Sequence, residues 1–268
     1  MRSLQQFWSV RRIGDDRVTL ARLGPLRLWL ARAEKEWGWA CEHGDNSEVM
    51  DIAQVPDDVL PEKLEWTKTL FAEAPREFHL QPAVPDRPVV VKPEQPVLIP
   101  DGESGLFFAC IPVVVEIILA AGKRKLVLGR VPSRRMSDTW FGLPVAGEFC
   151  YSLPGPARQE AQAIEPFPHL IVCPLEIQNR SGEVLNFEKL CLRPEYMALY
   201  CGAVHLWASR VRIQHEGAYR GTSIRYVADP PDQEPNLARI AAPLKREDRG
   251  LSRLTFSPGF SGDVIFGR

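Results

Sequence analysis

The chain has 268 residues, of which 45% are hydrophobic and 25% charged, and its formal net charge is −1. A chain of this length can bury a core without disulfides or metals, and the charge lacks the excess typical of nucleic-acid-binding proteins. The longest apolar run, Ile111 to Ala121, is interrupted by Glu116 and is shorter than the ~20 residues that cross a bilayer. Residues 1–16 lack the apolar segment of a signal peptide. These features predict a soluble cytoplasmic protein with no membrane segment and no nucleic-acid partner.

The cysteines are widely spaced and include no C-x-x-C pair, which disfavours a disulfide framework or a zinc site. Three of them lie in the apolar segments LFFACIP, GEFCYSL and HLIVCPL, a setting typical of buried reduced thiols. The histidines occur singly and never two or four residues apart, so their spacing predicts neither a metal site nor a cofactor. The cysteines are Cys41, Cys110, Cys150, Cys173, Cys191 and Cys201, and the histidines are His43, His79, His169, His205 and His215.

The first fifth of the chain contains four segments that alternate or concentrate β-forming residues, separated by turn residues. Gly14-Asp15-Asp16 and Gly24-Pro25 are the first two turns. The pattern predicts antiparallel hairpins over residues 1–56, which can form an N-terminal subdomain. The segments are FWSVRRI, RVTLARL, LRLWLAR and WGWACEH.

Residues 57–74 are compatible with either a helix or a strand. Leu64, Leu70 and Phe71 follow a helical spacing, whereas Leu64, Trp66 and Lys68 alternate as in a strand. We favour a strand around Trp66 because its neighbours on both sides are predicted strands.

Beyond Phe78, prolines separate a series of extended segments, and proline is confined to strand starts, edges and bulges. The run ESGLFFACIPVVVEIIL is predicted to be a central strand with a bend or bulge at Pro112. After Asp229 the sequence PPDQEPN has the composition of a linker, and the tail beyond it can either dock or fray. The prediction is an all-β protein with few or no helices. It is an antiparallel β-sandwich of two packed sheets over residues 1–228, with a linker and tail at 229–268.

Three motifs that carry common chemistries are missing from the sequence. There is no phosphate-binding G-x-x-x-x-G-K-[ST], no dinucleotide-binding G-x-G-x-x-G and no G-x-S-x-G nucleophile turn. The sequence therefore predicts no catalytic residue, and an enzyme is not the favoured interpretation.

One region, between Arg134 and Tyr151, concentrates polar and aromatic side chains. Arginine forks and an aromatic face can hold an anionic or planar ligand. In the alternative that we favour, Trp140 and Phe141 fill the core at a corner, Asp138 bonds its own turn, and Gly142 and Gly147 supply positive φ angles. The candidate binding residues are Arg134, Arg135, Asp138, Trp140, Glu148 and Tyr151.

Several segments, in their order and spacing, resemble a protein family. They include an apolar strand with a proline at Phe108 to Val113, a basic stretch leading to an aromatic-Gly turn at Arg134 to Gly142, and a Gly-x-x-Cys strand at Gly147 to Tyr151. A turn at Asn179-Arg180-Ser181 ends a further strand. Over about residues 66–227 the chain resembles domain-of-unknown-function family number 432, uncharacterised proteins of archaea and bacteria. The resemblance implies no activity and no site residue.

Three functional hypotheses are compatible with these observations. The first is a non-catalytic binding module that recognises a protein or another macromolecule through an exposed edge strand. The second is an enzyme or small-ligand binder with a site between the sheets or at the Arg134 to Tyr151 loop. The third is a structural subunit that forms a homo-oligomer.

Overall fold

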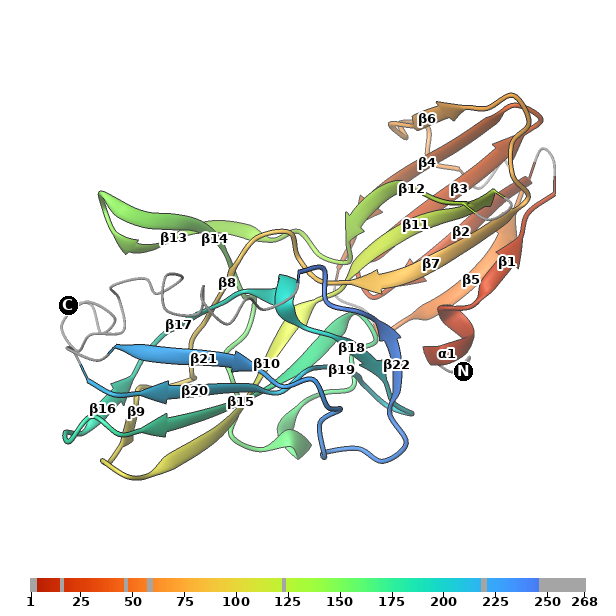
Figure 1. Ribbon diagram of the computed structural model, residues 1–268. Coiled ribbons are helices and arrows are strands. Elements are labelled where there is room, and N and C mark those ends of the chain that lie inside the picture. The colour runs from red at the N-terminus through yellow and green to blue at the C-terminus, as the bar shows by residue number, and fades with distance from the viewer. Residues whose placement is uncertain are drawn as a thin grey trace.

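The computed structural model describes residues 4–14, 17–45, 48–56, 60–121, 124–217 and 221–245. Strands dominate it, which confirms the predicted all-β class (Figure 1). In the described residues helix is limited to α1 (Leu4–Phe7) and two short 3-10 turns. None of these helices has the length and apolar character needed to cross a membrane.

Three of the four predicted N-terminal segments lie in a five-stranded antiparallel sheet in the order β5-β2-β3-β4-β6. The first segment, FWSVRRI, is a strand only over Val10–Arg12 and pairs with residues 77–79 in another sheet. The predicted strands at residues 17–43 are confirmed. Residues 57–74, which were compatible with a helix or a strand, contain the strand β6. Residues 57–59 lie outside the described residues. The strands are β2 (Arg17–Leu23), β3 (Leu26–Ala33), β4 (Glu36–His43), β5 (Met50–Val55) and β6 (Thr67–Leu70).

A second sheet packs against this one and completes the sandwich of the N-terminal lobe; it contains β1 and three strands from the middle of the chain. The facing sheet has the order β1-β7-β11-β12. Across the interface Trp37 packs edge-on against Phe78 with ring centroids 5.8 Å apart, and Leu30 and Leu80 are fully buried beside them. The strands are β1 (Val10–Arg12), β7 (Glu77–Ala83), β11 (Val114–Ala121) and β12 (Arg124–Pro132).

The C-terminal lobe is built around β15, which lies at the centre of a seven-stranded sheet (Figure 1). β15 pairs antiparallel with β10 and parallel with β19 and β20, so the sheet is mixed where a purely antiparallel one was predicted. The strands are β10 (Ser104–Pro112), β15 (Leu170–Asn179), β18 (Leu199–Cys201), β19 (Leu206–Ala208), β20 (Val211–His215), β21 (Thr222–Tyr226) and β22 (Ala238–Ala241).

Two smaller sheets accompany the large one. The order of the first is β13-β14-β8-β17, and the second is a ribbon of β9 and β16. These strands are β8 (Val89–Val91), β9 (Val97–Ile99), β13 (Ser137–Leu143), β14 (Ala146–Ser152), β16 (Leu185–Phe187) and β17 (Leu190–Leu192).

One long extended segment passes from one lobe to the other. β10 pairs in the C-terminal sheet and β11 in the β1-β7-β11-β12 sheet of the N-terminal lobe, and the chain changes sheets at Pro112 and Val113 (Figure 1). The Val113 N–H donates to the His169 carbonyl at 2.9 Å, and the Ser133 N–H donates to the Val113 carbonyl at 2.7 Å. The bend predicted at Pro112 is thus the crossing point. A single hydrophobic cluster continues through both lobes.

The segment after Asp229 is attached to the C-terminal sheet. The Glu234 carboxylate accepts hydrogen bonds from the Ala203 N–H, the Val204 N–H at 3.1 Å and the Trp207 indole N–H at 2.8 Å. A Cβ on Gly202 would lie 2.3 Å from this carboxylate, so glycine leaves the room for it. β22 then pairs with β18. The predicted linker therefore docks, and the attachment continues to Lys245, whose backbone N–H donates to the Glu195 carbonyl at 2.9 Å. The tail beyond residue 245 lies outside the described residues.

The anchoring role of Glu234 predicts pH-dependent stability. Burial opposes ionisation, but the hydrogen bonds from Trp207 and from the turn's backbone outweigh it and lower the pKa of Glu234. Because the pKa is lower in the folded state, the ionised carboxylate stabilises the fold at pH values above the ordinary glutamate pKa. This stabilisation is lost as the pH falls through the folded-state pKa. We expect Glu234→Gln to lower the free energy of unfolding by about 1–3 kcal/mol at pH 7.

Urea unfolding of the Glu234→Gln variant and the wild type at several pH values measures this effect. The difference should shrink below the ordinary glutamate pKa of about 4.3. The exposed Glu183→Gln is the matched control and should change little at any pH. A Glu234→Gln penalty of the same size at pH 3 and pH 7 contradicts the assignment.

Candidate functional site

Four of the six candidate residues lie on a hairpin that projects from the C-terminal lobe (Figure 1). Residues 137–152 belong to the region that was predicted to be a loop with a strand at Gly147 to Tyr151. They form β13 and β14 in a regular antiparallel register, which confirms that strand. Asp138 pairs with Tyr151, and Trp140 pairs with Phe149. β13 is at the edge of its sheet, and β14 joins it to β8 through parallel pairing.

Strand alternation divides the candidates between the two faces of this hairpin. Residues that pair across an antiparallel ribbon share a face, and successive residues point to opposite faces. We call the two faces of the hairpin the outer face and the inner face, and four residues are assigned to each. The outer face carries Asp138, Trp140, Phe149 and Tyr151, and the inner face carries Thr139, Phe141, Glu148 and Cys150.

The outer face presents an exposed aromatic pair. The Trp140 and Phe149 rings meet edge-to-face with centroids 5.1 Å apart, and they are 43% and 66% exposed. Val145, at the turn, is 95% exposed. Phe141 is buried as predicted, but Trp140 does not fill a core corner, because the pairing of β13 with β14 places it on the outer face. Such an exposed apolar group is typical of contact surfaces.

The two glycines of the hairpin have different roles. Gly142 has the positive φ that was predicted for it, 105°. Gly147 is not among the residues with positive φ. A Cβ at Gly147 would lie 2.3 Å from the indole nitrogen of Trp140, so glycine leaves the space in which the indole rests.

A polar network holds the base of the outer face. The Arg87 guanidinium forms an ion pair with Asp138 at 3.1 Å and lies 5.2 Å from the centroid of the Tyr151 ring. The Tyr151 hydroxyl donates to Asp86 at 3.1 Å, and burial together with this carboxylate raises the pKa of Tyr151. Asp138 therefore bonds a neighbouring segment and not its own turn, contrary to the prediction. The network fixes the hairpin to the segment that follows β7.

Arg134 and Arg135 precede β13 and do not join this network. Within the described residues, neither forms an ion pair. Arg134 lines a cavity of about 240 Å³ together with Cys110 and Phe167. Tyr151 lines a different cavity, of about 260 Å³. The six predicted residues are thus distributed over two faces and two cavities and do not form a single pocket.

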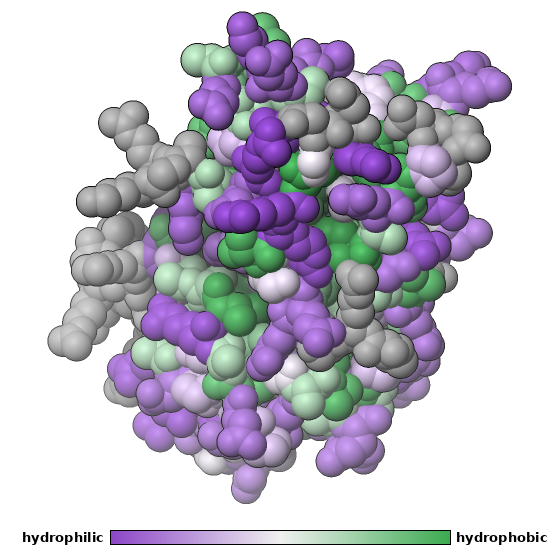
Figure 2. All heavy atoms as spheres, turned by 90° about the vertical axis from the view of Figure 1, so that its right-hand side faces the viewer, coloured by the Kyte–Doolittle hydropathy of each residue, from purple (hydrophilic) through white to green (hydrophobic). Residues whose placement is uncertain are grey.

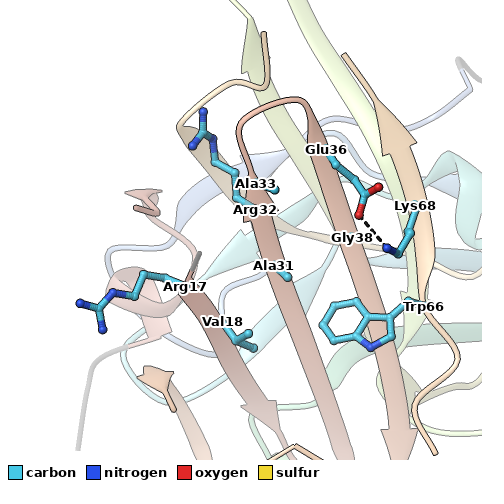
Figure 3. A pocket seen from close by; sticks show the side chains of 9 residues that line it. All are labelled: Arg17, Val18, Ala31, Arg32, Ala33, Glu36, Gly38, Trp66 and Lys68. Atoms are coloured by element: carbon cyan, nitrogen blue, oxygen red, sulfur yellow. Dashed lines mark ion pairs between the residues drawn. The ribbon is translucent and has the colours of Figure 1, made fainter. Parts of the chain in front are cut away.

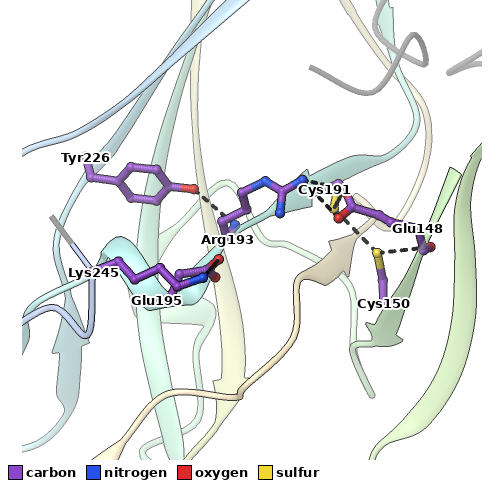
Figure 4. Close-up of polar contacts among 7 residues, drawn as sticks. All are labelled: Glu148, Cys150, Cys191, Arg193, Glu195, Tyr226 and Lys245. Atoms are coloured by element: carbon purple, nitrogen blue, oxygen red, sulfur yellow. Dashed lines mark hydrogen bonds and ion pairs between the residues drawn. The ribbon is translucent and has the colours of Figure 1, made fainter. Parts of the chain in front are cut away.

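The inner face contains a cluster that the sequence did not predict as a unit (Figure 4). The Cys150 and Cys191 sulfurs are 3.6 Å apart, and Oε1 of Glu148 lies 3.9 Å from the Cys191 sulfur. The Arg193 guanidinium donates to both Glu148 oxygens, at 2.7 and 2.9 Å. Cys150 is buried and Cys191 half-buried. Four reactive or charged groups therefore meet under the hairpin.

The two thiols differ in acidity because they interact. A hydrogen bond from the Cys191 S–H lowers the pKa of the Cys150 thiol. The same hydrogen bond, with burial, raises the pKa of Cys191. A further hydrogen bond joins Arg193 to the C-terminal sheet, because the Arg193 backbone N–H donates to the Tyr226 hydroxyl at 3.0 Å.

A second hollow lies on the N-terminal sheet (Figure 3). It has a volume of about 280 Å³ and arises where the small residues Ala31 and Gly38 lie beside the Trp66 ring. Two of the charged residues that line it, Glu36 and Lys68, form an ion pair with each other at 2.8 Å. The face on the right of Figure 1 shows hydrophobic residues only in small areas between hydrophilic ones (Figure 2). In its described residues this side has no extended apolar patch.

The comparison with protein families matches residues 7–260 to a family described as protein of unknown function (DUF432). The chain belongs to the DUF432 family. The match includes the N-terminal sandwich and the docked segment after Asp229, so the family extends well beyond the 66–227 region of the resemblance. No curated protein and no solved structure matches this DUF432 chain. Membership itself supplies no activity, so a functional proposal must rest on the geometry.

Proposed function

We propose that this DUF432 protein is a non-catalytic binding module, and that an extended acidic segment of a partner protein adds to the open edge of β13. The observation that carries the proposal is the position of β13. It is the outermost strand of its sheet and, among the described residues, pairs only with β14.

The sequence of β13 does not protect its edge. Exposed edges are usually blocked by lysine, proline or a bulge, because their unpaired backbone groups accept another strand. Residues 137–143 contain neither lysine nor proline, and their register with β14 is regular. Such an edge supports recognition by strand addition, in which backbone hydrogen bonds give affinity and side chains give specificity.

The side chains around the edge indicate the chemistry of the partner. Arg134 and Arg135 precede β13 by two to three residues in the chain, and planar guanidinium groups suit carboxylates. Trp140 and Phe149 offer an apolar surface that suits an apolar side chain of the added strand. A short segment with carboxylates at one end and an apolar residue next to them complements both features.

A small-ligand site or an enzyme is the less favoured alternative. The cavities beside the hairpin measure about 240 and 260 Å³, below the roughly 300–1,000 Å³ of typical ligand pockets. Among the described residues that line these cavities there is no histidine to serve as the base of a nucleophile-and-base pair.

A cytoplasmic location is part of this proposal. All six cysteines are free, although two sulfurs lie only 3.6 Å apart. Free thiols are typical of reducing compartments.

Affinity capture with matched variants tests the binding proposal. A Trp140→Ser/Phe149→Ser variant removes the aromatic surface, and Arg134→Ala/Arg135→Ala removes the positive charge. Leu70→Ser is the control, because Leu70 is 77% exposed on β6, an edge strand of the N-terminal sheet. We expect a protein captured reproducibly by the wild type to be retained by Leu70→Ser and lost by both hairpin variants. Equal capture by all four proteins contradicts the proposal.

A further inference from the structure

We propose that Cys150, Cys191 and Glu148 form a binding site for one zinc ion on the inner face of the hairpin. The site is distinct from the partner-binding edge, and it does not depend on the proposed function. It is built from two strands that flank β8, namely β14 and β17 (Figure 4).

The distances match those of a tetrahedral site. Two thiolates bound to one zinc ion, each at about 2.3 Å, lie about 3.8 Å apart, and the two sulfurs here are 3.6 Å apart. The nearest Glu148 oxygen lies 3.9 Å from the Cys191 sulfur, and the three ligand atoms all lie within 4.8 Å of one another. The side chains therefore already surround a position for a small ion.

The sheet register explains why these residues meet and why they do not form a disulfide. Ser152 and Cys191 are the residues opposite Val90, and Cys150 is two residues before Ser152. By strand alternation Cys150 and Cys191 therefore share a face with Val90, and the three side chains pack together. Strands that flank a third are about 9–10 Å apart, whereas a disulfide needs Cα atoms within about 7 Å. The two thiols approach each other from strands on either side of β8, and an ion can bridge the gap that a covalent bond cannot.

The charges in the cluster balance with a divalent ion present. Two thiolates and one carboxylate carry three negative charges, and one Zn²⁺ with the Arg193 guanidinium supplies three positive ones. Arg193 holds both Glu148 oxygens at 2.7 and 2.9 Å, as groups behind a metal ligand commonly do. Thiolate ligands favour zinc over magnesium or calcium. Three protein ligands leave a fourth position for water.

Cobalt substitution is the first test. The reduced, metal-free full chain is titrated with Co²⁺, whose bonds to thiolates give a charge-transfer absorption in the near ultraviolet. We expect one equivalent of Co²⁺ to bind with this absorption and to be displaced by Zn²⁺. Cys150→Ser and Cys191→Ser should lose the absorption, and Cys110→Ser, at a half-buried cysteine outside the cluster, should retain it. Arg193→Gln should weaken binding about 10–100-fold.

Thiol reactivity tests the same site without any substitution. In the folded wild type, Zn²⁺ should protect Cys191 from alkylation and leave the rate at half-buried Cys41 unchanged. The proposal is overturned if the wild type shows no thiolate-to-cobalt absorption, if both serine variants bind Co²⁺ as the wild type does, or if Zn²⁺ leaves alkylation of Cys191 unaffected. It is also overturned if mild oxidation joins Cys150 to Cys191 in a disulfide, detected as the loss of two hydrogens by mass.

Discussion

The Gly24→Ala variant is expected to lose about 2–5 kcal/mol of folding free energy. Gly24 has a φ of 57°, which costs a residue with a Cβ about 1–2 kcal/mol. The added Cβ would also lie 2.2 Å from Nδ1 of His169, in the other lobe. The His169 ring is buried and cannot move aside without shifting its neighbours, and overpacking of this kind costs roughly 1–3 kcal/mol.

The Gly102→Ala variant separates the two effects. Gly102 also has a positive φ, 80°, but nothing lies within 4 Å of the position that an added Cβ would take. It should therefore lose only the backbone contribution, about 1–2 kcal/mol. Urea unfolding of both variants gives the comparison. Equal losses at the two glycines would mean that the turn at Gly24 does not press on His169 and that the lobes are not in close contact there.

The Asn179→Ala variant is expected to lose about 2–4 kcal/mol. The Asn179 side chain is fully buried, and its amide donates to the Ile99 carbonyl at 2.8 Å and to the Glu183 carbonyl at 2.6 Å. Its oxygen accepts from the backbone N–H and the hydroxyl of Ser181. Alanine leaves several buried polar groups without these partners, and each such group costs about 1–3 kcal/mol, with partial relaxation. The side chain thus joins β15 to β9 and closes the turn.

Asn186→Ala is the control for this second variant. Asn186 is half-buried in β16, and its amide makes one side-chain hydrogen bond, to Glu188 at 2.9 Å. Its loss should cost about 1 kcal/mol. Thermal or urea unfolding of both variants decides the matter. If Asn179→Ala is no more destabilising than Asn186→Ala, the turn at residues 179–183 does not hold the end of β15 in place.

Local sequence patterns predicted the strands and turns because both depend on neighbouring residues. The alternation at residues 17–43 predicted β2, β3 and β4, and the proline in the long apolar run predicted the bend at Pro112. The pattern could not reveal that the chain changes sheets there, because that depends on strands distant in sequence. The linker composition of PPDQEPN likewise concealed the docking of Glu234, whose partners at residues 203–207 are about thirty residues away.

The candidate site was predicted only in part, because a local sequence pattern reveals neighbouring residues but not contacts between distant strands. Arg134 to Tyr151 was identified from its composition, and Glu148 was among its candidates. The alternation of β14 alone places Glu148 and Cys150 on one face and Tyr151 on the other, and this signal was available in the sequence. The sequence could not reveal that Cys191 lies close to Cys150, because β8 lies between β14 and β17 and the two cysteines are 41 residues apart.

Amide hydrogen exchange of β13 tests the central claim most directly. Exchange is measured for the full chain alone and in complex with the protein that the wild type captures. Strand addition gives hydrogen-bond partners to edge amides that otherwise face solvent. We therefore expect amides within residues 137–143 to exchange at least about tenfold more slowly in the complex, and those of β6 to be unchanged. A complex that forms while the β13 amides exchange as in the unbound protein contradicts recognition by this edge.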